Sequence, residues 1–329
     1  AELSRRRGMT RVAVVGAGVM GSATAWALAE RGVDVTLYEQ FEPGHTRGSS
    51  HGRTRIFRLA YPEAHWVALA EEALGGWREL EQQTGHQLLE LHGLIELCSS
   101  PAVTSADVLA SRGIEHSFLT RDDVRRKGIE LPHGWVALWQ QDAGVVRADR
   151  ALAAFRGDVP IVRGRVESLD DIDADIVVVT AGAWIAKLVP DAPVRVTRET
   201  IAYFRWGGAP APSVVELDDE TRLHAMYALH DPLHGLKAGA HHAGHEADPD
   251  VEEGADPLLV ERIVEWVRER FSDVDPTPIA AESCLYTSTD DESFVLERRG
   301  RFVIGSACSG HGFKFAPAVG RRLAALALG

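Results

Sequence analysis

Three glycines near the N-terminus and an acid that follows them have the spacing of a nucleotide-binding turn. Gly16, Gly18 and Gly21 follow a run of valines, and Glu39 ends a second β-branched run. In such a turn the first glycine permits a tight bend, the second lets a pyrophosphate approach the backbone, and the third lets helix and strand pack closely. The start of the helix binds the phosphates, and the acid accepts hydrogen bonds from a ribose. The motif predicts a dinucleotide, FAD or NAD, against the alternative of a glycine turn with no ligand.

Basic and histidine-rich segments are the next candidates for chemistry. Arg55 and Arg58 follow a loop rich in glycine and serine, and buried arginines beside a cofactor can pair with an anion. A solvated basic loop is the alternative. Histidine-rich tracts can bind a metal, but the histidines of segment 223–245 match no closed ligand set, so we expect no metal and exposed loop histidines instead. These are His224, His230, His234, His241, His242 and His245.

The elements that must position these residues follow from hydrophobic periodicity. Residues 12–39 predict a strand, a tight turn, a helix and a second, parallel strand. Residues 175–184 predict a buried parallel strand that ends in a glycine turn. Lys237 and His241 are an even number of residues apart, so on a strand we expect both side chains on one face. We further expect helices at 62–81, 106–112, 150–155, 256–271 and 318–328, a hairpin at 88–97, and strands at 135–140, 161–169 and 195–206.

Composition disfavours several classes of function. The 329 residues are 45% hydrophobic and 25% charged, which is typical of a globular protein large enough for two domains. The net charge of −13 disfavours binding to nucleic acid and to anionic membrane surfaces. No apolar run is long enough to span a bilayer, and we interpret Met9 as the natural start. Cys98, Cys284 and Cys308 are scattered, which favours free thiols in a reducing cytoplasm.

Two motifs far apart in the sequence resemble one protein family. Residues 48–58, Gly-Ser-Ser-His-Gly-Arg-Thr-Arg-Ile-Phe-Arg, and residues 309–314, Ser-Gly-His-Gly-Phe-Lys, resemble the monomeric sarcosine oxidase family, within the D-amino-acid-oxidase group of flavoproteins. The resemblance implies FAD and an α/β fold, in which a Rossmann-like FAD-binding domain accompanies an α+β substrate domain built on a mixed, largely antiparallel sheet. It implies an FAD-binding domain at 9–88, 143–190 and 292–329, and a substrate domain at 89–142 and 191–291.

The resemblance also implies which residues contact FAD. Cys284 resembles the cysteine that forms a thioether with the 8α-methyl group of the flavin, whereas free cysteines are more often small buried hydrophobes. Val166 resembles the position whose backbone meets the adenine. Residues 310–314 suit the pyrimidine end of the flavin, where negative charge gathers on reduction. The implied FAD contacts are Gly16, Gly18, Met20, Gly21, Glu39, Gln40, Ser49, Ser50, Arg55, Val166, Gly182, Trp184, Cys284, Gly310, Gly312, Phe313 and Lys314.

For catalysis the resemblance implies roles for four basic residues. Arg58 and Lys314 resemble the pair that binds the substrate carboxylate, with an ordinary surface ion pair as the alternative. Lys237 resembles the lysine whose positive charge stabilises superoxide as oxygen takes up an electron. Arg55 would lie against the flavin ring. The residues implied to line the active site are His241, Tyr227 and Tyr286.

The predicted function is an FAD-dependent oxidase of a secondary, N-methylated or cyclic amino acid. A hydride passes to flavin N5, the imine product is hydrolysed, and O2 is reduced to H2O2. The enzymatic alternatives are an oxidase of primary amino acids, similar to glycine oxidase, and a dehydrogenase with another electron acceptor. The alternative that is not an enzyme is a degenerate flavin-fold binding protein. We expect a cytoplasmic monomer whose partners are the amino acid and O2, with neither nucleic acid nor membrane.

Overall fold

The structure, a computed structural model, describes residues 10–218 and 226–329, so Met9 and His224 lie outside the described residues. The chain divides into two compact units. Unit 1 comprises Ala1–His51, Leu152–Arg195 and Thr287–Gly329, and unit 2 comprises Gly52–Ala151 and Val196–Tyr286. The expected domain limits stay predictions. The first segment of unit 1 ends well before residue 88, because the chain beyond residue 51 pairs with strands of unit 2.

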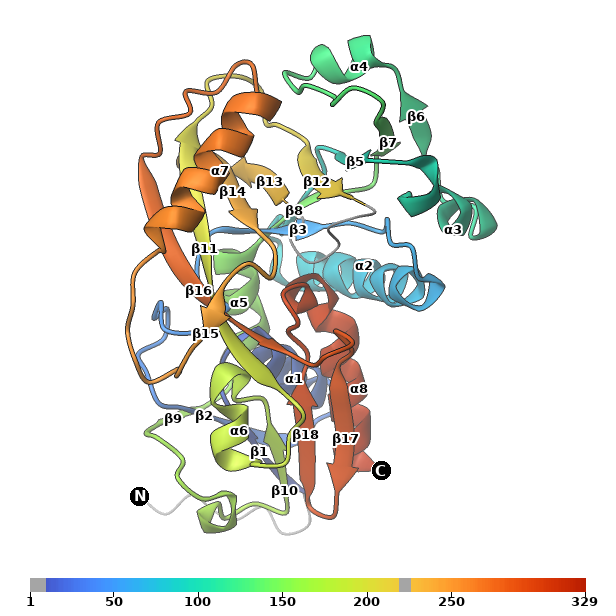
Figure 1. Cartoon of the computed structure of the whole chain (residues 1–329). Coiled ribbons are helices and arrows are strands. Elements are labelled where there is room, and N and C mark those ends of the chain that lie inside the picture. Colours follow the sequence, from blue (N-terminus) through green and yellow to red (C-terminus); the bar gives the residue numbers. More distant parts are fainter. Residues whose placement is uncertain (1–9, 219–225) are drawn as a thin grey trace. The chain divides into compact units, whose positions relative to one another are not determined.

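Unit 1 contains the predicted parallel sheet (Figure 1). Its described strands lie in the order β17-β18-β10-β1-β2-β9, and all neighbours are parallel except β17 and β18. The central strand β10 is Ile-Val-Val-Val and is buried throughout, as expected for a parallel strand covered on both faces. The strands are β1 Arg11–Val15, β2 Asp34–Glu39, β9 Ile161–Arg163, β10 Ile176–Val179, β17 Val295–Arg299 and β18 Phe302–Ser306.

Two helices from opposite ends of the sequence lie side by side in unit 1 (Figure 1). They are α1 (Val19–Ala29) and α8 (Ala316–Leu328), so the expected N-terminal and C-terminal helices are confirmed. Their backbones approach closely, because a Cβ atom on Gly320 would lie 2.6 Å from the backbone of Ala23. Alternate residues of β1, Ala13 and Val15, belong to an apolar cluster that includes Ile185. That cluster contains residues next to the short elements η3 (Gly182–Trp184) and α6 (Ile185–Leu188).

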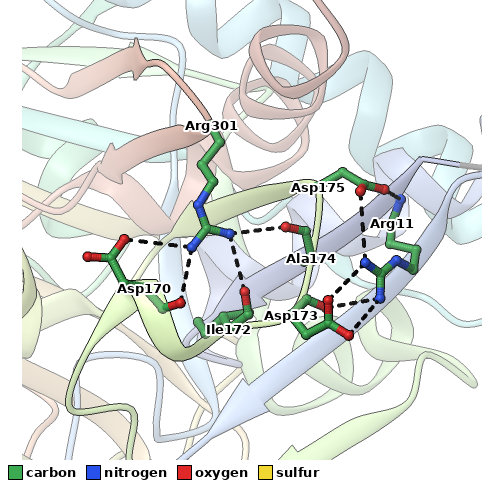
Figure 2. A network of polar contacts seen from close by, with 7 residues as sticks. All are labelled: Arg11, Asp170, Ile172, Asp173, Ala174, Asp175 and Arg301. Atoms are coloured by element: carbon green, nitrogen blue, oxygen red, sulfur yellow. Dashed lines mark hydrogen bonds and ion pairs between the residues drawn. The ribbon is translucent and has the colours of Figure 1, made fainter.

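Two arginines bind the link between β9 and β10 (Figure 2). Part of this link was expected to belong to a long strand at 161–169. That expectation was wrong: β9 ends at Arg163, and Leu169–Asp171 is the 3₁₀ helix η2. The Arg301 guanidinium donates hydrogen bonds to the carbonyls of Leu169, Ile172 and Ala174 at 3.0–3.2 Å. Gly164, the first residue after β9, has a φ of +150° and so departs from the strand conformation. Arg11 in turn pairs with Asp173 and Asp175 and ties the link to the start of β1.

Unit 2 is built on a larger sheet, mixed but largely antiparallel, as predicted. Its described strands lie in the order β15-β11-β14-β13-β12-β5-β7-β6, with β16 paired to β11. Only β12 and β5 are recorded as parallel among these described neighbours. The strands are β5 Leu94–Cys98, β6 Ser117–Leu119, β7 Val136–Gln140, β11 Arg195–Arg205, β12 Ser213–Leu217, β13 Met226–Asp231, β14 Gly235–Ala240, β15 His245–Glu246 and β16 Ala280–Ser288.

The two faces of β14 have different neighbours. Leu236, Ala238 and Ala240 belong to a core cluster that includes Trp266 and Val267 of helix α7 (Pro257–Arg270). Figure 1 shows α7 across the strands of this sheet. Because side chains alternate along a strand, Lys237 lies on the opposite face. The sheet therefore presents Lys237 away from the core that α7 covers.

A small three-stranded sheet carries the first basic residues. It has the order β3-β8-β4, with β3 Thr54–Phe57, β8 Gly144–Arg147 and β4 Leu89–Glu90. The hairpin expected at 88–97 was wrong, because β4 pairs with β8 while β5 belongs to the large sheet. Gly93 separates the two strands, and a Cβ atom there would lie 1.9 Å from the ring of Trp139. The remaining helices are α2 Ala64–Thr84, η1 Pro101–Val103, α3 Ala106–Ser111, α4 Arg121–Arg125, α5 Ala148–Arg156 and η5 Gly312–Phe315.

Candidate active site

The glycine turn of unit 1 has the geometry that its spacing predicts. Gly16 has a φ of +99°, and a Cβ atom there would lie 2.4 Å from the carbonyl oxygen of Thr180. A Cβ atom on Gly21 would lie 1.8 Å from the Gly16 carbonyl oxygen. Gly18 is the N-cap of α1 and makes no side-chain cap, and the first turn contains no acid. The start of α1 therefore offers backbone N–H groups and a positive dipole end to an anion.

Glu39 and Ser50 both reach this turn. The buried Glu39 carboxylate accepts hydrogen bonds from the N–H groups of Ala17 at 3.0 Å and Phe41 at 2.9 Å. The Ser50 hydroxyl accepts a hydrogen bond from the N–H of Val19 at 3.0 Å. Unit 1 thus brings an acid and a hydroxyl from two later segments to the start of α1, as expected of groups that contact the ribose and phosphates of a dinucleotide.

The second predicted motif of unit 1 packs against the segment after β2. Trp184 contacts the Phe41 ring edge-on, with ring centroids 5.3 Å apart. Gly182 has a φ of +53°, and a Cβ atom there would meet no other atom within 4 Å. Val166 is partly buried against the apolar cluster next to β1. Contacts of Gln40, Ser49 and these residues with a ligand stay predictions.

The glycine-histidine loop, residues 309–314, lies next to the start of α1. A Cβ atom on Gly312 would lie 1.7 Å from the Ala307 carbonyl oxygen and 3.2 Å from the Met20 side chain. Ser309 and Gly310 have positive φ values of 38° and 71°. Unit 1 therefore brings the first and last predicted motifs together, and this proximity rests on the close packing of α1 against α8.

Buried polar groups surround the base of this loop. Lys314 is 6% exposed and donates a hydrogen bond to the His311 carbonyl oxygen at 2.8 Å, and Phe313 is also buried. The Ser309 N–H donates to the carbonyl of Thr287 at 2.9 Å. Within the described residues, the buried hydroxyls of Thr287 and Ser288 have no hydrogen-bond partner. Sequence reasoning missed these two hydroxyls, although they directly follow Tyr286 in the sequence.

Two cations, the buried Lys237 and the partly buried Arg55, converge in unit 2. Arg55 Nη1 and Lys237 Nζ both donate to the Thr54 carbonyl oxygen, at 2.9 and 3.4 Å. A Cβ atom on Gly52 would lie 3.3 Å from Arg55 Nη1 and 3.9 Å from Lys237 Nζ, so a side chain there would compete for the same space. Burial, together with the charge of Arg55, lowers the pKa of Lys237 to about 7. Lys237 can therefore exist with or without its proton near neutral pH.

An acid and a tyrosine lie beside these cations, and the sequence reasoning missed both. Tyr203 is the cross-strand partner of Lys237, and its hydroxyl donates to Glu282 Oε2 at 3.0 Å. Burial and the charge of Glu282 raise the pKa of Tyr203. The signal for Glu282 was its spacing of two from Cys284 and four from Tyr286, which places all three on one face of β16.

The predicted aromatic and histidine side chains also come together in unit 2. His241 Nδ1 lies 3.2 Å from the Tyr286 hydroxyl, and the rings of Tyr227 and His241 are 6.5 Å apart. A hydrogen bond also joins Tyr227 to Tyr286, while burial raises the pKa of Tyr227. β14 ends one residue before His241. Gly239 is a further residue that sequence reasoning missed, because a Cβ atom there would lie 2.6 Å from the Tyr227 hydroxyl.

Arg58 lies just beyond β3 and is largely buried. Its guanidinium lies 4.1 Å from the centre of the Tyr61 ring, and its Nη1 is 3.5 Å from Glu96 Oε1. The N–H groups of Leu59 and Ala60 both donate to the Gln140 side-chain carbonyl, at 3.0 and 3.2 Å, which fixes the backbone next to Arg58. The alternative of a solvated basic loop is therefore wrong for this arginine.

Several histidines of segment 223–245 have neighbours within the protein. His230 Nδ1 lies 3.1 Å from the Gly235 carbonyl oxygen, His234 Nδ1 lies 3.1 Å from Asp231, and His245 Nε2 lies 3.1 Å from Glu253. His230, His234, His241 and His242 are partly buried, so the expectation of exposed loop histidines was wrong for these four. The first two lie at or next to the turn that joins β13 and β14. Cys284 is partly exposed on β16 and is in no disulfide.

Unit 1 fits an anionic dinucleotide. Its glycines leave no room for side chains at Gly16 and Gly21, Glu39 lies within reach of the turn, and the hydroxyls of Thr287 and Ser288 are buried without partners among the described residues. Unit 2 separately supplies the cations and the aromatic side chains.

Of the helices that the structure describes, none is both long and apolar enough to cross a bilayer.

Comparisons with known proteins agree over the whole chain. A family model described as FAD dependent oxidoreductase matches residues 11–326. A peroxisomal sarcosine oxidase of Mus musculus is 32% identical, covering 96% of this chain and 91% of the relative. A monomeric sarcosine oxidase of Bacillus sp. (strain B-0618) is 31% identical, covering 96% of this chain and 92% of the relative.

Solved structures extend the likeness to the fold. NikD, an unusual amino acid oxidase essential for nikkomycin biosynthesis, matches with a TM-score of 0.84 at 25% identity, covering 97% of this chain and 94% of that chain. The fructosamine oxidase Amadoriase II of Aspergillus fumigatus matches with a TM-score of 0.79 at 20% identity, covering 97% and 86%. The second likeness concerns the fold alone.

Proposed function

We propose, because the chain belongs to the family of FAD-dependent oxidoreductases, that it oxidises a secondary or N-methylated amino acid, with O2 as the electron acceptor. The observation that carries the choice of O2 is the pair of cations Arg55 and Lys237, which share the Thr54 carbonyl within unit 2. The substrate class is supported by the relatives, which are sarcosine oxidases.

Residues of unit 1 hold the cofactor in this proposal. The start of α1 at Gly18 takes the diphosphate, Glu39 takes the ribose, and residues 310–314 take the pyrimidine end of the flavin. Bound FAD would supply the redox chemistry, because a flavin can accept a hydride from the carbon next to the amine and pass the electrons on to O2. The partnerless hydroxyls of Thr287 and Ser288 support a polar ligand beside this loop.

Lys237 acts on oxygen in this proposal. Its ammonium stabilises the negative charge that O2 acquires with its first electron, and it does so where water does not screen the charge. Lys237 is 4% exposed, so its charge is desolvated. A dehydrogenase with another acceptor does not need this buried charge, and for this reason we prefer an oxidase.

Arg58 and Lys314 bind the substrate carboxylate in this proposal, and Arg55 lies against the flavin ring. The Arg58 guanidinium lies over the Tyr61 ring, and Nη1 of Arg58 has no hydrogen-bond partner among the described residues. That nitrogen can donate to a carboxylate oxygen. The hydrogen-bonded group of His241, Tyr286 and Tyr227 provides the wall next to the amine substituent.

Three finer proposals accompany the main one. We propose that Cys284 carries the flavin through a thioether, which is supported by its partly exposed thiol on the same face of β16 as Tyr286. We propose a monomer, by analogy with the monomeric sarcosine oxidase of Bacillus. We propose a cytoplasmic location from the scattered cysteines, although relatives in mouse and human are peroxisomal.

The decisive experiment measures H2O2 release from the purified flavin-loaded protein with sarcosine, N-methylated amino acids, proline, pipecolate and glycine. We expect peroxide from secondary amino acids and little from glycine. The variant Lys237→Met, compared with the exposed-lysine control Lys187→Met, should reduce O2 far more slowly while still passing electrons to an artificial dye. Peroxide from glycine alone would favour the primary-amine alternative. Dye reduction without peroxide in the parent protein would favour the dehydrogenase.

A further inference from the structure

One carboxylate lies inside an otherwise apolar strand of unit 2. All residues of β5 are buried, and the side chain of Glu96 is 0% exposed between Ile95 and Leu97. Its cross-strand partners are the apolar residues Leu138 and Val215. Burying a charge in such surroundings is unfavourable unless it is paired. The sheet itself does not require an acid at this position, so the side chains that contact Glu96 must account for it.

The partners of Glu96 are one serine and one arginine. Ser105 donates twice, from its N–H to Oε2 at 3.1 Å and from its hydroxyl to Oε1 at 2.8 Å. Arg58 Nη1 lies 3.5 Å from Oε1, which is an ion pair but not a hydrogen bond. The guanidinium also lies over the Tyr61 ring. Glu96 therefore acts on Arg58 through its charge, and the N–H of Nη1 stays available to another acceptor.

Binding of a substrate carboxylate would place two anions on one guanidinium. With the site empty, Arg58 and Glu96 cancel each other's charge. A second carboxylate at Arg58 would add one negative charge to this buried group, and two carboxylates that share one guanidinium disfavour each other's ionisation. Burial already raises the pKa of Glu96, and the charge of Arg58 opposes this rise. A substrate carboxylate would cancel that opposition.

We propose that Glu96 takes up a proton from solvent when a substrate carboxylate binds to Arg58, so that binding leaves the net charge of this buried group of residues unchanged. The inference rests on the proposed role of Arg58 in binding substrate. In the empty state the charges are those of Arg58 and ionised Glu96. In the occupied state they are those of Arg58 and the substrate, and the neutral Glu96 carries the added proton on one carboxyl oxygen.

The surroundings of Glu96 contain few other groups that titrate. Within the part of the chain that the structure describes, Arg58 is the charged side chain that shifts the pKa of Glu96. The strands on either side present Leu138 and Val215. The remaining titratable neighbours are Cys98, two positions along the same strand, and Tyr61 beneath the guanidinium.

Proton uptake can be counted without any variant. The probe is methoxyacetate, whose ether oxygen replaces the amine so that it cannot be oxidised, and the protein is the flavin-loaded enzyme. Isothermal titration in buffers with different ionisation enthalpies gives the number of protons bound with each methoxyacetate. We expect net proton uptake of at most one proton for each methoxyacetate, and a dissociation constant that rises with pH wherever uptake occurs. Methoxyacetamide, which has no carboxylate, is the control and should bind without proton uptake.

Variants identify the group that takes up the proton. Glu96→Gln keeps the shape and an oxygen for Ser105, so we expect methoxyacetate to bind about tenfold more tightly than to the parent at about pH 8, without proton uptake. Ser105→Ala removes a hydrogen bond to the charged form, which raises the pKa of Glu96, so proton uptake should be smaller at the same pH. Proton uptake that persists in Glu96→Gln would point to Lys237 or His241 and would overturn the inference.

The role of Arg58 is tested separately. If Arg58→Met binds methoxyacetate as tightly as the parent does, the proposed substrate contact is wrong and this inference fails with it. If Arg58→Met loses binding while the parent binds methoxyacetate with no proton uptake, the substrate contact stands and only the inference about Glu96 fails. If Glu96→Gln does not fold, the proton count on the parent and on Ser105→Ala still decides the question.

Discussion

Replacing Lys237 with methionine should stabilise the fold at neutral and acidic pH, although it removes the group proposed to act on oxygen. The pKa of Lys237 is lowered from its ordinary value of 10.5 to about 7 in the folded protein. Because a difference of one between two pKa values corresponds to about 1.4 kcal/mol, carrying the charged lysine costs the folded state about 5 kcal/mol. Methionine has a similar unbranched shape and carries no charge, so the variant does not bear this cost.

The sign of the pH dependence follows from where each state binds the proton. Between about pH 7 and about pH 10.5 the unfolded chain carries this proton and the folded protein does not, so parent stability rises with pH. Below about pH 7 both states are protonated and the whole cost is present. The stability advantage of Lys237→Met should therefore be about 5 kcal/mol near pH 6, about 3 kcal/mol near pH 8 and about 1 kcal/mol near pH 10.

The assay is urea unfolding of both proteins in the same flavin-loaded form, followed by tryptophan fluorescence at each pH. The titration of Lys237 is isolated by how the difference in unfolding free energy between variant and parent changes with pH, and not by its size at one pH. The packing of an uncharged methionine side chain does not vary with pH. Lys187→Met is the control, since that lysine is exposed, and its difference from the parent at each pH is the baseline for the Lys237→Met difference. A constant difference for Lys237→Met, or one that grows toward alkaline pH, would refute the pKa assigned to Lys237.

Three further predictions concern groups around the same cations. Glu282→Gln removes a negative charge that raises the pKa of Lys237, so the apparent pKa in the pH profile of O2 reduction should move below about 7; an unchanged profile would exclude this influence. Cys284→Ser should give a colourless pellet and a yellow supernatant on acid precipitation, whereas the parent pellet should be yellow; two colourless pellets would exclude the thioether. Gly239→Ala places a Cβ atom against the Tyr227 hydroxyl and should raise KM about tenfold, more than it changes kcat, with FAD content unchanged; equal KM values would show that Tyr227 does not contact substrate.

The parts of the fold that the sequence predicted are those in which local pattern and tertiary environment agree. The stretch from Val12 to Glu39 has a valine run, spaced glycines and a second β-branched run, and each feature is needed locally for the turn that the structure shows. Amphipathic helices such as α2 and α7 were predicted for the same reason, because one face of each is buried. The family resemblance added the cofactor and the roles of distant residues.

The parts that the sequence did not predict depend on contacts between remote segments. Residues 88–97 have the composition of a hairpin, but β4 finds its partner in β8, more than fifty residues later. The strand expected at 161–169 ends at Arg163, where Gly164 follows with a φ of +150°, and Arg301 binds carbonyls of the link beyond it. Gly239 could not be distinguished from other strand glycines until Tyr227 was placed across from it.

The most consequential omission was two acids, Glu96 near Arg58 and Glu282 near Lys237. These acids explain why the sites around Arg58 and Lys237 should respond differently to pH. Beside Arg58, the acid Glu96 is the group proposed to change its protonation when a substrate carboxylate arrives. Lys237 has Glu282 and Asp231 as more distant compensating charges, and Arg55 close by opposes its protonation. Its proton therefore becomes the labile one. Substrate binding and oxygen reduction should consequently follow different titrations in one protein, the first set by an acid next to an arginine and the second by the lysine itself.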